Sequence, residues 1–195
     1  AKNQEGYSNL SSILSHYLTN GLYKKKPRIY KKYLEKNRSN ILIGSGCCEG
    51  DVFISALNEN KESLKKKISF YDYIEVQPPS AYKHIIYQLG TNGTHIIEET
   101  ILKIITECKK QNKLIIASSN AHYLNYNDKI YREIYINAKL IGGGINKLSY
   151  FPKEHLPDNF LLTTQEMIDS FYFLDKKTVE EIVIYNTHIL NNQID

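Results

Sequence analysis

Residues 98–122, EETILKIITECKKQNKLIIASSNAH, indicate the fold class of this chain. The first part of the stretch repeats isoleucines, with one cysteine, at the spacing of an amphipathic helix. The second part, residues 114–118, is short and apolar, which is typical of a buried strand. The polar residues Asn120 and His122 follow this strand directly. A helix that leads into a buried strand favours an α/β fold.

The same alternation of helices and strands continues on both sides of this stretch. Two further predicted strands span residues 41–43 and 71–77, and Pro78-Pro79 stops the second. Helical patterns cover residues 5–22, 51–57, 61–70, 98–111, 128–140, 164–173 and 176–191. This order favours a parallel α/β arrangement. A closed eight-stranded barrel needs about 250 residues, so a barrel could be present here only in part.

Length and composition limit the class of protein. The 195 residues suit one domain, or one domain with a short appendage. No apolar run reaches the length of a membrane span, so no membrane partner is expected. An odd number of cysteines without a secretory pattern indicates the reducing cytoplasm. Because the sequence begins Ala1-Lys2-Asn3 with no initiator Met, we interpret it as part of a longer protein.

Two predicted strands end close to side chains that can bind a metal. Cys47 follows the strand at residues 41–43, and Asn120 and His122 follow the strand at residues 114–118. Functional groups collect at the carboxyl ends of parallel strands. Thiolate and imidazole suit zinc, and the alternation of an extended segment would put Asn120 and His122 on one side. The alternative is structural, since a single cysteine often serves as a small apolar residue.

A dense basic segment lies between residues 24 and 38. Eight basic residues stand there against Glu35 alone, which gives a local charge of +7 in a chain of net charge +4. The predicted nucleic-acid contacts are Lys24, Lys25, Lys26, Arg28, Lys31 and Lys32. Interleaved tyrosines could stack on bases. The alternative is a solvated surface, or a docking face for another domain.

Several motifs resemble one family over nearly the whole chain. They read AKNQEGYSNL, KKPRIYKKYLEKNRSNILIGSGCCEGDVF, FYDYIEVQPP, NAHYLNYNDKIYREIYIN and LPDNFLLTTQEMIDSFYFL, in that order. The chain resembles the part of the PHP (polymerase and histidinol phosphatase) domain that follows the exonuclease insertion in PolC-type DNA polymerase III alpha subunits. The resemblance implies the C-terminal portion of a distorted (β/α) PHP-type barrel with trailing helices. We expect residues 1–160 to form the second part of the barrel and residues 161–195 a helical connector towards the polymerase core.

The resemblance also implies a metal site shared with sequence outside this chain. Cys47 matches the family's cysteine at a strand end, and Asn120 and His122 match its Asp/Asn-x-His motif. A divalent metal, zinc or manganese, is expected in the intact PHP domain, while the fragment alone lacks the family's early His-x-His ligands. Many family members carry Asp where Asn120 stands, and Asn is a weaker donor. The family's His-Phe-Arg is replaced here by Phe160-Leu161-Leu162.

The function implied by the resemblance is that of a replicative polymerase segment. The parent protein would synthesise DNA and proofread it with a 3′–5′ exonuclease, in contact with DNA, its own other domains and replisome subunits. We assign no catalytic residue to this chain, because it shows no acidic pair typical of a two-metal site. Two alternatives stay open: a free-standing PHP-type metal-dependent phosphoesterase, and a basic nucleic-acid-binding module.

Overall fold

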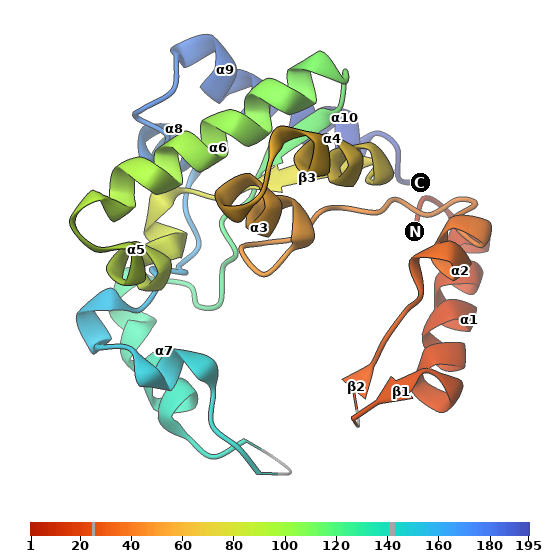
Figure 1. Ribbon diagram of the computed structural model, residues 1–195, viewed down its shortest axis with the longest axis horizontal. Helices are drawn as coiled ribbons and strands as arrows, with labels where there is room; N and C mark the ends of the chain where they lie inside the picture. Colours follow the sequence, from red (N-terminus) through yellow and green to blue (C-terminus); the bar gives the residue numbers. More distant parts are fainter. Residues whose placement is uncertain (25, 141–142) are drawn as a thin grey trace.

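The computed structural model describes residues 1–24, 26–140 and 143–195, and its centre is a parallel sheet (Figure 1). Strand β3 (Tyr73–Val76) pairs in parallel with β4 (Leu114–Ala117), and Tyr73 lies opposite Leu114. A parallel bridge from Gly44 to Tyr73 adds the preceding segment on the other side of β3. Parallel strands joined by helices confirm the α/β fold class.

The predicted strand at residues 41–43 is wrong as a regular strand. Only the bridge at Gly44 is formed, because the carboxylate of Asp72 replaces a backbone partner. The amide of Ile43 donates to Asp72 Oδ2 at 2.8 Å, and the amide of Asp72 donates to the Ile43 carbonyl at 2.9 Å. These residues therefore lie beside β3 without continuing its backbone ladder.

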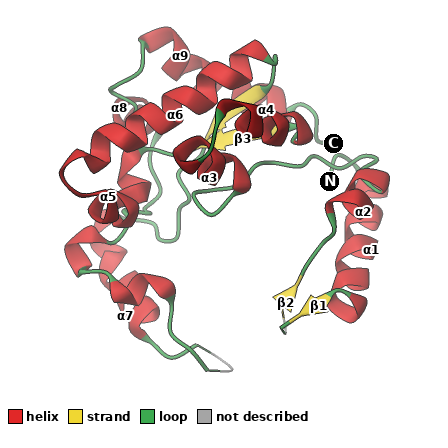
Figure 2. Ribbon diagram, viewed as in Figure 1, coloured by secondary structure: helices red, strands yellow, loops and turns green. Residues whose placement is uncertain are grey.

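Most of the predicted helices are present (Figure 2). Their bounds are α1 (Gln4–Asn20), α2 (Lys31–Lys36), α3 (Asp51–Asn58), α4 (Lys61–Phe70), α5 (Lys83–Leu89), α6 (Gly93–Lys110), α7 (Lys129–Asn137), α8 (Thr164–Ser170), α9 (Lys176–Glu180) and α10 (Asn186–Asn191). A π-helical segment, η6 (Glu181–Tyr185), makes α9 and α10 continuous. The predicted capping box of Thr163 and Glu166 begins α8. Helices α2 and α5 were not predicted from the sequence.

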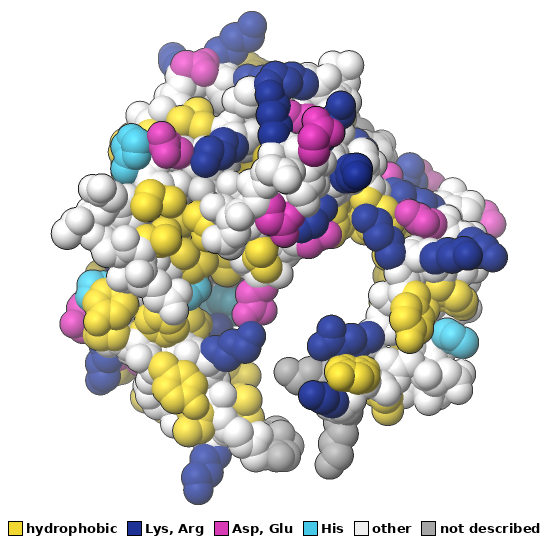
Figure 3. All heavy atoms as spheres, viewed as in Figure 1, with side chains coloured by type: hydrophobic (Ala, Val, Ile, Leu, Met, Phe, Trp, Pro, Cys, Tyr) yellow, Lys and Arg dark blue, Asp and Glu magenta, His cyan; other side chains and the backbone are white. Residues whose placement is uncertain are grey.

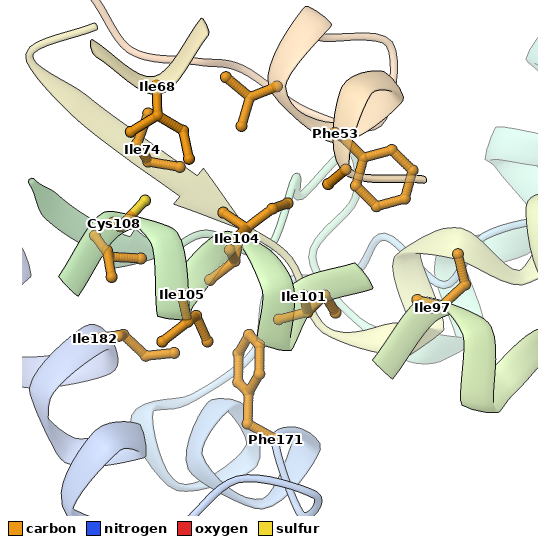
Figure 4. Close-up of a cluster of buried hydrophobic side chains, with 14 of the residues drawn as sticks. Phe53, Ile68, Ile74, Ile97, Ile101, Ile104, Ile105, Cys108, Phe171 and Ile182 are labelled. Atoms are coloured by element: carbon orange, nitrogen blue, oxygen red, sulfur yellow. The ribbon is translucent and has the colours of Figure 1, made fainter. Parts of the chain in front are cut away.

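The main hydrophobic core is organised around α6 (Figure 4). Ile104 of α6 lies in the same cluster as Ile74 of β3, while Phe171 and Ile182 approach α6 from the C-terminal helices. All of these side chains are buried. In addition, Asn186 Nδ2 donates to the carbonyl of Ile115 at 2.8 Å, which satisfies an acceptor on the edge of β4. The core therefore contains residues from both sides of position 160, the predicted domain boundary. The role of residues 161–195 as a connector stays a prediction.

Residues 1–40 form an N-terminal arm beside this body (Figure 1). The arm contains α1, the short hairpin of β1 (Leu22–Tyr23) and β2 (Lys26–Pro27), and α2. It has a small core in which Ile13 and Tyr17 pack with Ile41. Arg38 joins the arm to the body, since its guanidinium pairs with Asp72 at 2.8 Å and donates to the Phe70 carbonyl at 3.0 Å.

Within the described ranges, no helix combines the length and the apolar character that a membrane crossing requires.

Candidate metal centre and nucleic-acid interface

The candidate ligand Cys47 lies in a turn at the carboxyl edge of the sheet. Ser45, just before it, is buried and accepts a hydrogen bond from the amide of Glu75 at 2.9 Å. Gly46 has a φ of +71°, a conformation that favours glycine, and turns the chain at this point. The Cys47 carbonyl then accepts from the amide of Gly50 at 2.8 Å. Cys47 is thus held by backbone contacts and is partly exposed.

Asn120 and His122 follow β4 at the same edge, but the segment between them is not extended. Asn120 has a φ of +51° in the left-handed region, which Asn tolerates better than most residues. The extended conformation on which the expected placement of both side chains relied is therefore absent at Asn120. The amide of His122 donates to the Asn159 carbonyl at 2.7 Å, which fixes the His122 backbone against another segment.

The two segments that carry Cys47 and His122 flank β3 on opposite sides. Neighbouring strands lie about 4.8 Å apart, so the two flanking backbones are separated by roughly 10 Å. Within residues 1–24, 26–140 and 143–195, no three His, Cys, Asp or Glu side chains gather closely enough to enclose a metal. This chain therefore offers donors of the right type on both sides of β3 without a complete ligand set.

Glu75 is a candidate that the sequence reasoning missed. It lies on β3, between the segments of Cys47 and His122, and its Oε2 accepts from the hydroxyl of Ser118 at 3.2 Å. The signal was present in the strand pattern. Ile74 and Val76 are buried, whereas the alternating position of Glu75 is only half-buried. A carboxylate on the central strand is well placed to complete a set of oxygen, nitrogen and sulfur donors.

The electrostatics of this edge affect the candidate donors differently. Partial burial of the ring, reinforced by Arg132, lowers the pKa of His122, which favours the neutral imidazole that a metal requires. Burial, together with Cys47, raises the pKa of Cys48 to about 12, so Cys48 stays protonated. Cys48 packs against the main core, and of the two adjacent cysteines Cys47 is the better candidate donor.

Several buried polar atoms around this edge have no hydrogen-bond partner among the described residues. They are Gln77 Oε1, His84 Nδ1, Arg132 Nε and Asn159 Nδ2. Gln77 ends the β3 segment and Asn159 contacts His122, and each residue is only 3% exposed. An unsatisfied buried group costs about 1–3 kcal/mol. These unpaired atoms near the carboxyl edge of the sheet fit a site that binds a polar group, such as a metal with its water ligands.

The basic segment is exposed, but several of its side chains contact aromatic rings. Lys24, Arg28, Lys31 and Lys32 all lie on the surface. Arg28 and Lys24 lie 5.4 and 5.5 Å from the centre of the Tyr23 ring, and Lys31 lies 3.8 Å from that of Phe70. Lys25 lies outside the described residues, as does the side chain of Lys26. Figure 3 shows Lys and Arg side chains over the body as well as over the arm.

Comparison with known protein families finds a match for the N-terminal part of the chain. Residues 1–77 match the family model of the PHP domain. The match includes Cys47 and ends before Asn120 and His122. The ligand roles of Cys47, Asn120 and His122 all stay predictions.

The whole chain is similar to one segment of much longer relatives named DNA polymerase III PolC-type. Identity is 36% over 195 residues with the protein of Halalkalibacterium halodurans, 37% over 199 residues with that of Bacillus subtilis and 38% over 200 residues with that of Lactococcus lactis. Each alignment covers all of this chain, which spans only 12–13% of the length of those relatives. The resemblance to the PHP region of PolC-type polymerases is confirmed.

Proposed function

We propose that this chain is a segment of a replicative DNA polymerase that works in the cytoplasm, contributing part of a PHP metal site and structural support. The observation that carries the proposal is the alignment of the whole chain with 12–13% of each PolC-type relative. DNA synthesis and 3′–5′ proofreading would belong to the longer protein. DNA, the other domains of that polypeptide and replisome subunits would be its partners.

An immunoblot of the source cells with an antibody against this chain tests the proposal. We expect one band from a polypeptide many times longer than 195 residues, which co-purifies with DNA polymerase activity. A band at the size of this chain alone would contradict the proposal and favour a free-standing PHP phosphoesterase.

Within the longer protein, the segment would contribute Cys47, His122 and Asn120 to a divalent metal, zinc or manganese. Glu75 joins this proposed set because it lies between the two flanking segments. A bound divalent ion would polarise a phosphoester or brace the fold. The residues of this chain would hold the ion, while the unpaired Gln77 and Asn159 side chains would bind the polar groups around it.

The exposed basic segment, Lys24–Arg38, would supply sequence-independent contacts to DNA phosphates. Its described lysines and Arg28 are exposed, except for the side chain of Lys26, which lies outside the described residues, and Tyr30 is 76% exposed beside them. A solvated surface is the competing interpretation, since Lys31 and Arg38 already have intramolecular partners. Salt dependence separates the two, because phosphate contacts release counterions.

Replacing Lys24, Arg28 and Lys32 by alanine should weaken binding of the chain to duplex DNA. At about 0.9 per phosphate contact, the slope of log affinity against log salt should fall by up to about 2.7. The measurement is a fluorescence-anisotropy titration at several salt concentrations.

The matched control for this experiment replaces Lys61, Lys65 and Lys66, three exposed lysines of α4. It removes the same charge from another surface and should leave the slope nearly unchanged. Equal losses in both variants, or no binding by the unmodified chain, would favour the solvated surface.

A further inference from the structure

The backbone of His122 is positioned by the segment at residues 158–161, which is far away in sequence. Besides the bond from His122 to the Asn159 carbonyl, the amide of Asn159 donates to the hydroxyl of Tyr123 at 3.1 Å. The amide of Leu161 donates to the Tyr123 carbonyl at 3.0 Å, and a parallel bridge joins Tyr123 to Phe160. The segment thus acts as a short strand that holds His122 at the carboxyl edge of the sheet.

This segment is itself held by Asp158. The amide of Asp158 donates to the carbonyl of Ser80, in the connection that follows β3, at 3.1 Å. Its carboxylate pairs with Lys83 and, at 2.7 Å, with Lys129. Lys83 begins α5 and Lys129 begins α7, so one carboxylate joins the segments that follow β3 and β4.

The ion pair of Asp158 with Lys129 is shielded from solvent, whereas Lys83 is 36% exposed. The side chain of Asp158 is 10% exposed and that of Lys129 is 16% exposed. Burial opposes ionisation of the carboxyl, but hydrogen bonds and charge attraction from the two lysines outweigh it and hold the pKa of Asp158 below its usual range. The carboxylate is therefore charged at neutral pH. Its removal would leave a buried cation without its partner, which is strongly destabilising.

From these contacts we propose that Asp158 is a positioning residue for His122, acting through Asn159 and the two lysines. Any effect of Asp158 on metal binding rests on the proposed function. Its effect on the position of the His122 backbone does not. The contacts predict that loss of the carboxylate loosens the backbone at residues 122–123 while the rest of the sheet stays in place.

Amide hydrogen exchange of the metal-free chain tests this proposal. In Asp158→Asn, the amide of His122 should exchange at least about tenfold faster, which corresponds to about 1.4 kcal/mol. The amide of Ser118, which donates to the Val76 carbonyl at 2.9 Å, should keep its exchange rate. Asp158→Glu should restore part of the protection, and the control Asp169→Asn, at an exposed position of α8, should change neither amide.

If Asp158→Asn does not fold, Lys129→Met removes one partner and leaves the pair of Asp158 and Lys83. It should then give a smaller acceleration confined to the same region. Unchanged exchange at His122, or equal acceleration at Ser118, would overturn the proposal. Because no metal is present, these outcomes are independent of whether His122 binds one.

Discussion

Replacing Phe171 by alanine is expected to lower the free energy of unfolding by about 3–5 kcal/mol. Phe171 is completely buried and lies against α6 in the main core. Truncating an aromatic side chain removes its transfer free energy and leaves a cavity that the surrounding helices fill only in part. The measurement is chemical denaturation of the chain, followed by circular dichroism.

The neighbouring Tyr172 provides a matched control, since it is 67% exposed. Tyr172→Ala should change stability by less than about 1 kcal/mol, because its main contact is one surface hydrogen bond to Glu98. If Phe171→Ala were equally mild, residues 161–195 would be a loosely attached connector. A large effect would show instead that these helices stabilise the same domain as α6.

The proposed metal site of the intact protein is expected to depend on Cys47 and His122. Mutating a residue that only supports a metal ligand typically lowers metal affinity by about 10- to 100-fold. Cys47→Ser and His122→Ala would remove ligands themselves, so each should lower the affinity for zinc or manganese by more than that. Metal content after dialysis, measured by mass spectrometry on the longer polymerase, checks the result. Glu75→Gln should have a similar effect if its carboxylate completes the set.

His155 provides the matched control for this experiment. Its ring stacks on that of Tyr87, with 4.1 Å between the ring centres. His155→Ala should retain the metal of the unmodified protein. If Cys47→Ser and His122→Ala also retained it, both residues would have structural roles, and the buried unpaired atoms near Gln77 would need another ligand.

Prediction from sequence succeeded where one local pattern was sufficient. The helical spacing before Cys108 and the apolar run at residues 114–118 correspond to α6 and β4. Thr163 and Glu166 form the predicted capping box. These features depend on neighbours three or four residues away, or on alternation within one strand, so the sequence carries them directly.

Prediction failed where a distant side chain changed the local outcome. The apolar run at residues 41–43 has strand character, yet Asp72 takes over part of its hydrogen bonding. Asn120 and His122 have the spacing of an extended pair, but the left-handed conformation of Asn120 breaks the alternation. Helix α5 closely follows Pro78-Pro79, which the sequence marked only as the end of a strand.

The sequence by itself therefore determined the α/β class, most helix positions, the basic segment and the residue types suited to a metal. Only the tertiary structure decided that Glu75 lies between the segments of Cys47 and His122, and that Asp158 joins Lys83 to Lys129. The physical reason is the range of the interactions. Periodicity and capping act within one helix or strand, whereas ion pairs and bridges join residues that approach each other only when the core packs.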